Sequence, residues 1–163
     1  MKKFFQMIQR VQSLYLLIPF LFYLFYWIFG LSWYNQGYEF IKDIPSFLSL
    51  SPFFIDFFLS VTSYVPLLIS VFCFIAIIAF KKRLFQIKIS RISFYLSVFM
   101  SIYTLIYFYF TLSYLIDQMS SFFMQVLLFL AIINPFICTL SIFFAIRCIQ
   151  KDQELIKSID RLR

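Results

Sequence analysis

The stretch Lys81-Lys82-Arg83-Leu84-Phe85-Gln86-Ile87-Lys88-Ile89-Ser90-Arg91 lies at the middle of the chain, between two long apolar regions. It holds five basic residues and no acidic residue. Long apolar regions avoid water, whereas a cluster of basic side chains stays beside water or lipid headgroups. The stretch therefore predicts an exposed loop that separates two transmembrane hairpins.

The composition of the whole chain excludes an ordinary water-soluble domain. Of its 163 residues, 63% are hydrophobic and only 13% are charged. A soluble domain is about half apolar and about a quarter charged. A chain of this length cannot enclose so much apolar surface by itself, so we expect a bilayer to cover it. The net charge of +7 then indicates segments beside an anionic cytoplasmic leaflet rather than a nucleic-acid surface.

Four apolar regions are long enough to cross a bilayer, because about 20 helical residues span its hydrocarbon core. They lie at about 11–33, 57–80, 92–112 and 122–146. The sequence thus predicts an all-α membrane protein, a four-helix bundle made of two transmembrane hairpins in one domain. Ser51-Pro52 is typical of a helix start. For the outer connection at 34–56, a short interfacial element and an irregular apolar loop both remain open.

The basic residues indicate how the chain is oriented. All but Lys42 of the 14 Lys and Arg residues lie in the N-terminal segment, in the central stretch or in the tail at 147–163. These three segments share one side of the membrane if the chain crosses it four times. The positive-inside rule places them in the cytoplasm. We therefore expect a multi-pass protein of the inner membrane with both termini cytoplasmic.

The tail, 147–163, alternates charged residues with apolar residues that recur on one helical face. This pattern predicts an amphipathic cytoplasmic helix that continues the fourth span. The tail also carries acidic residues that can pair with the basic central stretch: Asp152, Glu154 and Asp160. We expect the tail to fold back against that stretch.

Small and polar side chains form two seams within the predicted spans. One repeats every four residues, at Ser93, Ser97 and Ser101. The other alternates spacings of three and four, at Ala131, Asn134, Cys138, Ser141 and Ala145. Such seams allow helices to approach closely and hydroxyls to bond across, so we interpret Ser93, Ser97, Ser101, Asn134 and Cys138 as helix-packing residues. Asn134 can also line a pore, or hydrogen-bond the backbone opened at Pro135.

The side chains on which most enzymes and ion-coupled pumps depend are missing from the sequence. It contains no His, and its three Cys residues form no Cys-x-x-Cys pair. No charged residue lies within the core of a predicted span, where a coupled transporter needs one. We therefore expect no metal, no cofactor and no enzymatic activity.

Three segments resemble an uncharacterised family of small bacterial inner-membrane proteins, defined only as a domain of unknown function. They are Met7-Ile-Gln-Arg-Val-Gln-Ser-Leu-Tyr-Leu-Leu17, the basic part of the central stretch at 82–90, and the tail from Ala145 to Asp160-Arg-Leu-Arg163. The resemblance spans the whole chain and implies four spans with both ends inside, but it implies no activity. Family members start near Met7, so residues 1–6 are either an extension or precede the true start.

These observations predict a non-catalytic accessory, assembly or scaffold protein that acts through its cytoplasmic segments. The alternative is a small oligomeric transporter or channel, with a path along Asn134 and the serine seam. A membrane or cytoplasmic partner protein is expected rather than nucleic acid, and the oligomeric state is left open. The candidate contacts with a partner or with lipid are charged residues: Lys81, Lys82, Arg83, Lys88, Arg91, Arg147, Asp152, Glu154, Asp160 and Arg161.

Overall fold

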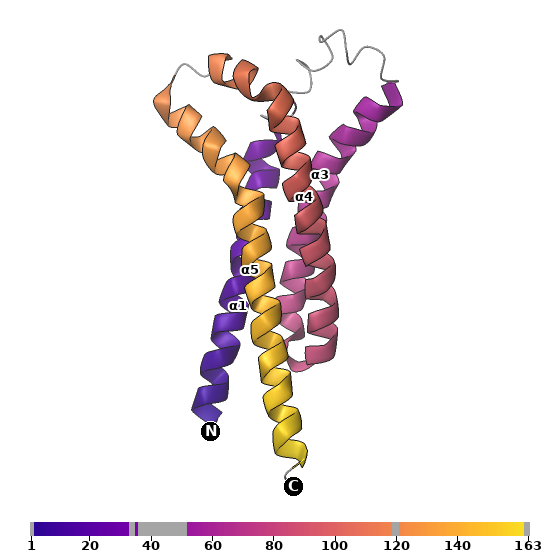
Figure 1. Cartoon of the computed structure of the whole chain (residues 1–163), viewed down its shortest axis with the longest axis vertical. Coiled ribbons are helices and arrows are strands. Elements are labelled where there is room, and N and C mark those ends of the chain that lie inside the picture. The colour runs from indigo at the N-terminus through magenta and orange to yellow at the C-terminus, as the bar shows by residue number, and fades with distance from the viewer. Residues whose placement is uncertain (1, 33–34, 36–51, 119–120, 162–163) are drawn as a thin grey trace.

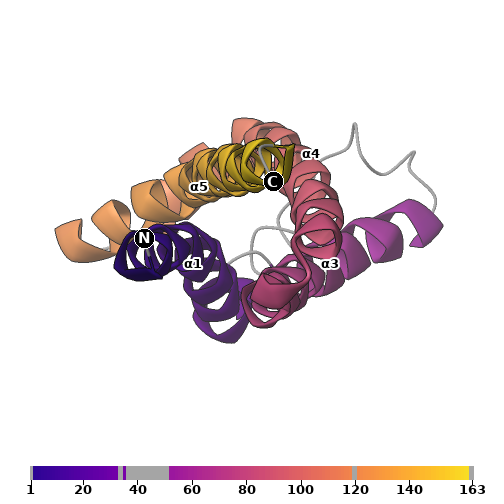
Figure 2. The ribbon, with the colours of Figure 1, turned by 90° about the horizontal axis from the view of Figure 1, so that it is seen from below.

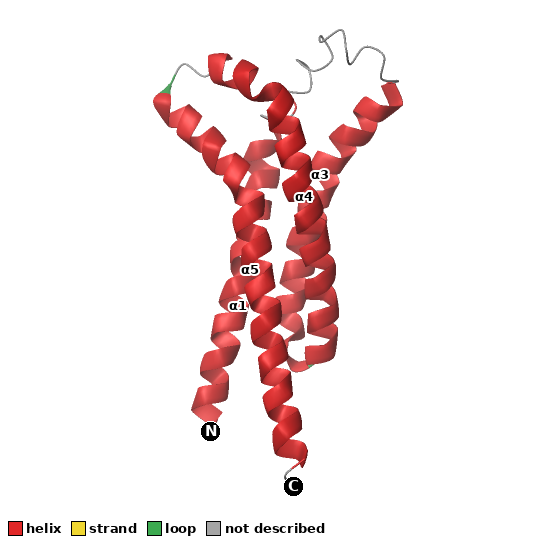
Figure 3. Cartoon of the chain, in the orientation of Figure 1, coloured by secondary structure: helices red, strands yellow, loops and turns green. Residues whose placement is uncertain are grey.

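The computed structural model describes residues 2–32, 35, 52–118 and 121–161, and these form an almost wholly helical chain (Figure 3). The elements are α1 (Lys2–Phe25), a π-helical continuation η1 (Tyr26–Gly30), α3 (Pro52–Ile78), a 3-10 turn η2 (Ala79–Lys81), α4 (Arg83–Gln118) and α5 (Phe122–Arg161). The predicted all-α fold is confirmed. α3 begins at Pro52, as its start signal indicates. The outer connection falls largely outside the described residues.

The four long helices form a bundle in which each packs mainly on two neighbours. Viewed along the axis, they follow a ring in the order α1, α3, α4, α5 (Figure 2). The start of α1, the α3–α4 turn and the end of α5 lie at one end of the bundle (Figure 1). We call it the terminal end and the opposite one the far end. At the far end, the first turns of α3 and α5 diverge (Figure 1).

All four helices are long and apolar enough to cross a membrane. The apolar spans run over Val11–Gly30, Ser60–Ile78, Arg83–Tyr109 and Gln125–Ile156. Large apolar side chains such as Tyr109 and Phe129 are exposed on the outside, which is expected of helices that face lipid rather than water. The predicted four-helix membrane architecture is thereby confirmed, and the chain is a multi-pass membrane protein.

The prediction that the central stretch is a loop is wrong. Lys82 alone lies between η2 and α4, and its φ of −105° and ψ of 73° make the turn. From Arg83 onward the stretch is helical. Residues 83–91 contain neither Gly nor Pro and consist largely of Arg, Leu, Gln, Lys and Ile, which are compatible with a helix. The basic residues Arg83, Lys88 and Arg91 therefore occupy fixed positions on the first turns of α4.

The tail does not fold back as the sequence analysis expects. α5 is one helix from Phe122 to Arg161, and it continues past the α3–α4 turn (Figure 1). A reversal needs a break in the helix, and residues 147–161 contain no Gly or Pro to favour one. The predicted continuation of the fourth span as a helix is present. The expected contact between a tail acid and the central stretch does occur, between Asp152 and Arg83, because α4 and α5 run side by side.

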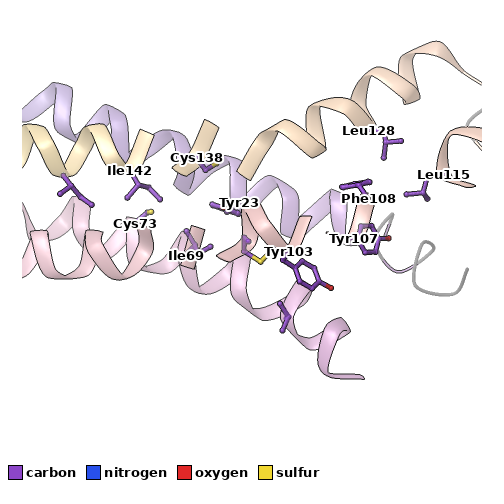
Figure 4. Close-up of a cluster of buried hydrophobic side chains, with 13 residues drawn as sticks. Tyr23, Ile69, Cys73, Tyr103, Tyr107, Phe108, Leu115, Leu128, Cys138 and Ile142 are labelled. Atoms are coloured by element: carbon purple, nitrogen blue, oxygen red, sulfur yellow. The ribbon is translucent and has the colours of Figure 1, made fainter. Parts of the chain in front are cut away.

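The apolar core extends along the bundle and does not form a single compact nucleus. Figure 4 shows its side chains distributed from Ile142 and Cys73 to Leu115 and Leu128, near the far end. Polar side chains alternate with this core, and several are as deeply buried as the apolar ones. In a membrane protein, lipid can cover apolar faces, so the polar faces of the helices turn inward. The uncharged polar candidates of the spans therefore lie in the interior of the bundle.

Candidate functional site

One face of α4 carries a continuous row of polar side chains that point into the bundle. Its members repeat every three or four residues: Arg83, Gln86, Ser90, Ser93, Ser97 and Ser101. From Gln86 to Ser101 all of them are buried. The predicted serine seam therefore lies in the interior. It also extends two turns beyond the predicted span, toward the terminal end.

Two further seams, on α5 and α1, run to the same end of the bundle. On α5, Cys138, Ser141 and Ala145 are buried, and the same alternation of three and four residues continues to Asp152. On α1, the buried residues recur at similar spacing: Gln12, Leu16, Pro19 and Tyr23. Each seam is a packing face of the kind that joins helices at a small crossing angle.

The three seams meet in a polar cluster at the terminal end, formed by Gln12, Arg83 and Asp152, which we call the end cluster. Gln12 Nε2 donates a hydrogen bond to Asp152 Oδ2. Arg83 Nη1 lies 4.0 Å from the same oxygen. Asp152 is 2% exposed and Gln12 is 5% exposed. The cluster thus joins α1, α4 and α5 through one buried carboxylate.

Burial makes this carboxylate dependent on its two partners. An ionised group that leaves water loses several kcal/mol of hydration free energy, so buried charges are paired and hydrogen-bonded. Gln12 supplies a hydrogen bond and Arg83 supplies the opposite charge. Two buried polar atoms of α4 make no hydrogen bond with any group in the described part of the chain: Arg83 Nη1, in the cluster, and Ser90 Oγ, seven residues further along the helix. Within the cluster, Arg83 therefore has a donor that no hydrogen bond uses.

A second polar group lies in the middle of the bundle and contains only hydroxyls. Tyr23 Oη and Ser97 Oγ are 2.8 Å apart, and Ser97 Oγ is 2.8 Å from Thr139 Oγ1. Ser101 Oγ lies 3.1 Å from the same Thr139 oxygen. This hydroxyl network of Tyr23, Ser97, Ser101 and Thr139 links α1, α4 and α5. Ser70 ties α3 to α1 by donating to the Phe20 carbonyl at 3.2 Å.

The other charged candidates lie on the outer surface of the bundle. Exposed side chains among them are those of Lys82, Lys88, Arg91, Arg147 and Glu154. The Arg147 guanidinium carbon lies 5.1 Å from the centroid of the Phe143 ring, in a cation–π contact. Lys81, Asp160 and Arg161 belong to helices, but their side chains are outside the described part. Among these candidates, the described residues form one ion pair, between Arg83 and Asp152.

Asn134 forms a contact within its own helix. Its Oδ1 accepts a hydrogen bond from Cys138 Sγ at 3.3 Å, and its side chain is half-buried. Thr139 donates to the carbonyl of Pro135 at 2.8 Å, so polar side chains cluster around the proline. The hydrogen bond that Asn134 makes is thus within α5, and it favours a structural role for Asn134 in its own helix over a contact with a neighbouring helix.

Several residues of the end cluster, the hydroxyl network and the polar row of α4 were not predicted from the sequence: Gln12, Tyr23, Gln86, Ser90 and Thr139. A usable signal exists for part of them. The three-and-four spacing of the α5 seam continues without a break from Ala145 to Asp152, and that of α4 continues back from Ser93 to Arg83. Extending both patterns into the charged segments predicts that Arg83 and Asp152 face inward. Nothing in a single sequence pairs Gln12 with a residue 140 positions away.

Comparison with known proteins places the chain in a family without assigning an activity. No curated protein and no solved structure matches the chain. The family model described as Domain of unknown function (DUF4293) matches residues 8–162. The match runs from α1 to the last turn of α5 and includes every residue of the end cluster and of the hydroxyl network. It agrees with the resemblance to an uncharacterised family. The chain belongs to the DUF4293 family.

Proposed function

We propose that this protein is a non-catalytic scaffold or accessory subunit of the inner membrane, which holds a partner protein at the cytoplasmic end of its bundle. The observation that carries the proposal is the burial of Asp152 between Gln12 and Arg83. This contact fixes the direction in which α5 leaves the bundle. A tail that served only to halt translocation would not need buried contacts from Asp152 to Gln12 and Arg83.

α5 continues for nine residues beyond Asp152, to Arg161. At 1.5 Å per residue it reaches about 14 Å further along its axis. Its exposed surface near the exit combines a cation, an acid and an apolar side chain, from Lys151, Glu154 and Leu155. A rigid helix with such a mixed surface suits the docking of another protein, because little conformational entropy is lost on binding. The positive-inside rule supports a cytoplasmic location for it.

The test is affinity purification of the full chain from native membranes in mild detergent, with quantitative mass spectrometry. We expect a partner in stoichiometric amount with the native chain. The variant Lys151→Glu/Glu154→Lys reverses two exposed charges of α5 and leaves the net charge unchanged. It should release the partner.

The matched control changes an exposed charge elsewhere at the same end of the bundle. Lys82→Glu alters the α3–α4 turn and leaves α5 intact, so it should keep the partner. Repeated failure to find a stoichiometric partner would contradict the proposal. If Lys82→Glu released the partner to the same extent, then the overall charge of this end, and not the α5 surface, would be what retains the partner.

One observation favours transport as a second candidate function. Asp152 is a buried acid that faces the interior of the bundle at its terminal end, and buried ionisable residues of membrane proteins often mark ion or proton pathways. The polar row of α4 leads from it to the hydroxyl network. Liposomes containing the purified protein should then show proton or cation flux that Asp152→Asn abolishes and Glu154→Gln leaves intact. Absence of flux in the native protein argues against this candidate.

A further inference from the structure

The contact between α4 and α5 places two arginines side by side. Ser97 and Thr139 bond at 2.8 Å, and the rings of Phe94 and Phe143 lie 6.1 Å apart, which fixes the antiparallel register of the two helices. Arg91 is three residues from Phe94 and Arg147 is four residues from Phe143, both toward the terminal end. Steps of three and four keep a side chain on one face of a helix. Arg91 and Arg147 therefore lie at one level, next to the aromatic contact.

These two residues also mark the edge of the uncharged surface of their helices. No charged residue occurs at 92–116 of α4 or at 122–146 of α5. Both arginines are exposed, and the next basic residues toward the terminal end are Lys88 and Lys151. The edge of a long uncharged segment is where hydrocarbon gives way to lipid headgroups. The arginine pair thus lies at the depth of the lipid phosphates.

The arginine pair has no acidic partner among the described residues. Asp152 is buried and lies against Gln12 and Arg83. Glu154 is seven residues beyond Arg147, about 10 Å further along the helix axis. The Phe143 ring holds the Arg147 guanidinium against the apolar surface. Two neighbouring cations without a counter-charge repel each other, and a bound anion would remove that repulsion.

We propose that Arg91 and Arg147 together bind the phosphate of an anionic phospholipid, and that one of its acyl chains lies along Phe94 and Phe143. A guanidinium group binds a phosphate through two parallel hydrogen bonds. Basic residues between transmembrane helices recognise anionic headgroups in this way. A zwitterionic lipid carries a cation of its own, so it neutralises the arginine pair less well.

The test compares lipid retention by the purified full chain in mild detergent, using native mass spectrometry. The probes are phosphatidylglycerol and phosphatidylcholine with identical acyl chains. The native protein should retain phosphatidylglycerol about tenfold more tightly. The variant Arg91→Gln/Arg147→Gln should lose that preference. Equal retention of the two lipids by the native protein would overturn the proposal.

The control variant Lys82→Gln/Lys151→Gln removes the same charge from exposed positions at the same end. It should keep most of the preference. An equal loss in both variants would show diffuse attraction and would overturn a specific site. Competition by millimolar inorganic phosphate would show a site for soluble anions instead of lipid. If circular dichroism and gel filtration show that the double arginine variant does not fold, phosphatidylglycerol retention is measured for Arg91→Gln and for Arg147→Gln separately. Each should weaken retention, and unchanged retention in both would refute the site.

Discussion

The end cluster and the hydroxyl network connect the same three helices by different chemistry. In the end cluster, a carboxylate at Asp152 is held by Gln12 and Arg83. In the hydroxyl network, every member is neutral, and each contact between helices is a hydrogen bond between hydroxyls. The first group is at the terminal end, where charged residues begin, and the second lies where the helices are uncharged.

The difference shows how much each group depends on its partners. A hydroxyl can return to its own helix: Thr139 donates to the Pro135 carbonyl and Ser101 donates to the Ser97 carbonyl. A buried carboxylate has no such alternative, because a helix offers it no free donor in its interior. Loss of one partner should therefore be costly in the end cluster and mild in the hydroxyl network. The following variants measure this contrast.

Arg83→Leu should give the largest effect. It leaves the Asp152 carboxylate buried without an opposite charge, and removal of one member of a buried pair costs about 3–5 kcal/mol of stability. Unfolding of the purified protein in detergent, followed by circular dichroism, measures the change. The adjacent exposed Lys82→Leu serves as the control and should stay close to the native protein.

The variant Arg83→Leu/Asp152→Leu separates the charge from the packing. Removing both charges eliminates the unpaired carboxylate, so the double variant should be more stable than Arg83→Leu alone. If the double variant is less stable than Arg83→Leu, the ion pair is not what makes that substitution costly. The charged character of the end cluster would then be irrelevant to its stability.

Gln12→Leu should have the next largest effect. It keeps the approximate size of the side chain but removes the donor to Asp152, and an unmade hydrogen bond to a buried charged group costs about 1–3 kcal/mol. The same unfolding measurement applies. Gln153→Leu, the same change at a half-buried position of α5, is the control and should cost less. If the Gln12→Leu variant were as stable as the native protein, the contact between α1 and Asp152 would contribute nothing to stability.

Thr139→Val tests the hydroxyl network with little change of shape. The variant loses hydrogen bonds to Ser97 and Ser101, and such bonds between membrane helices contribute about 0.6–1.7 kcal/mol. Thr111→Val is the control, because Thr111 is buried and, like the half-buried Thr139, donates to its own helix, at the Tyr107 carbonyl. A larger loss for Thr139 isolates the contribution between helices. Equal losses would mean that contacts across the helices add nothing.

Much of the fold can be predicted from this sequence because the bilayer simplifies the problem. Uncharged segments of sufficient length must be helices, since no other open structure satisfies the backbone in hydrocarbon. Their ends are harder to place. The basic stretch beginning at Lys81 invites interpretation as a loop, but exposure to water does not imply irregular backbone. Only Lys82 leaves the helix there, and α4 starts one residue later.

The end cluster is less predictable for a different physical reason. Charged residues near a span are normally solvated, so Arg83 and Asp152 read as surface residues. The sequence predicts that both side chains face the interior only if the three-and-four spacing of the α4 and α5 seams is extended beyond the apolar segments. That extension needs α5 to continue as one helix into the tail, as the amphipathic pattern of the tail predicts and the structure has it. The pairing of Gln12 with Asp152 depends on the order of helices around the ring, which no local pattern specifies.

The smallest effect is expected for Glu154→Gln, which is compared with Asp152→Asn on the same helix. Asp152→Asn removes the charge that faces Arg83 in the interior, whereas Glu154→Gln changes an exposed residue only two positions later. Because an exposed charge contributes little, Glu154→Gln should leave the unfolding transition unchanged, while Asp152→Asn should lower it. Both substitutions change one charge and conserve shape, so their difference reports the burial of Asp152 together with its contacts to Gln12 and Arg83. A shift for Glu154→Gln as large as that for Asp152→Asn would mean that total charge at this end sets stability. The contrast between a charged cluster and a neutral network would then lose its basis in specific contacts.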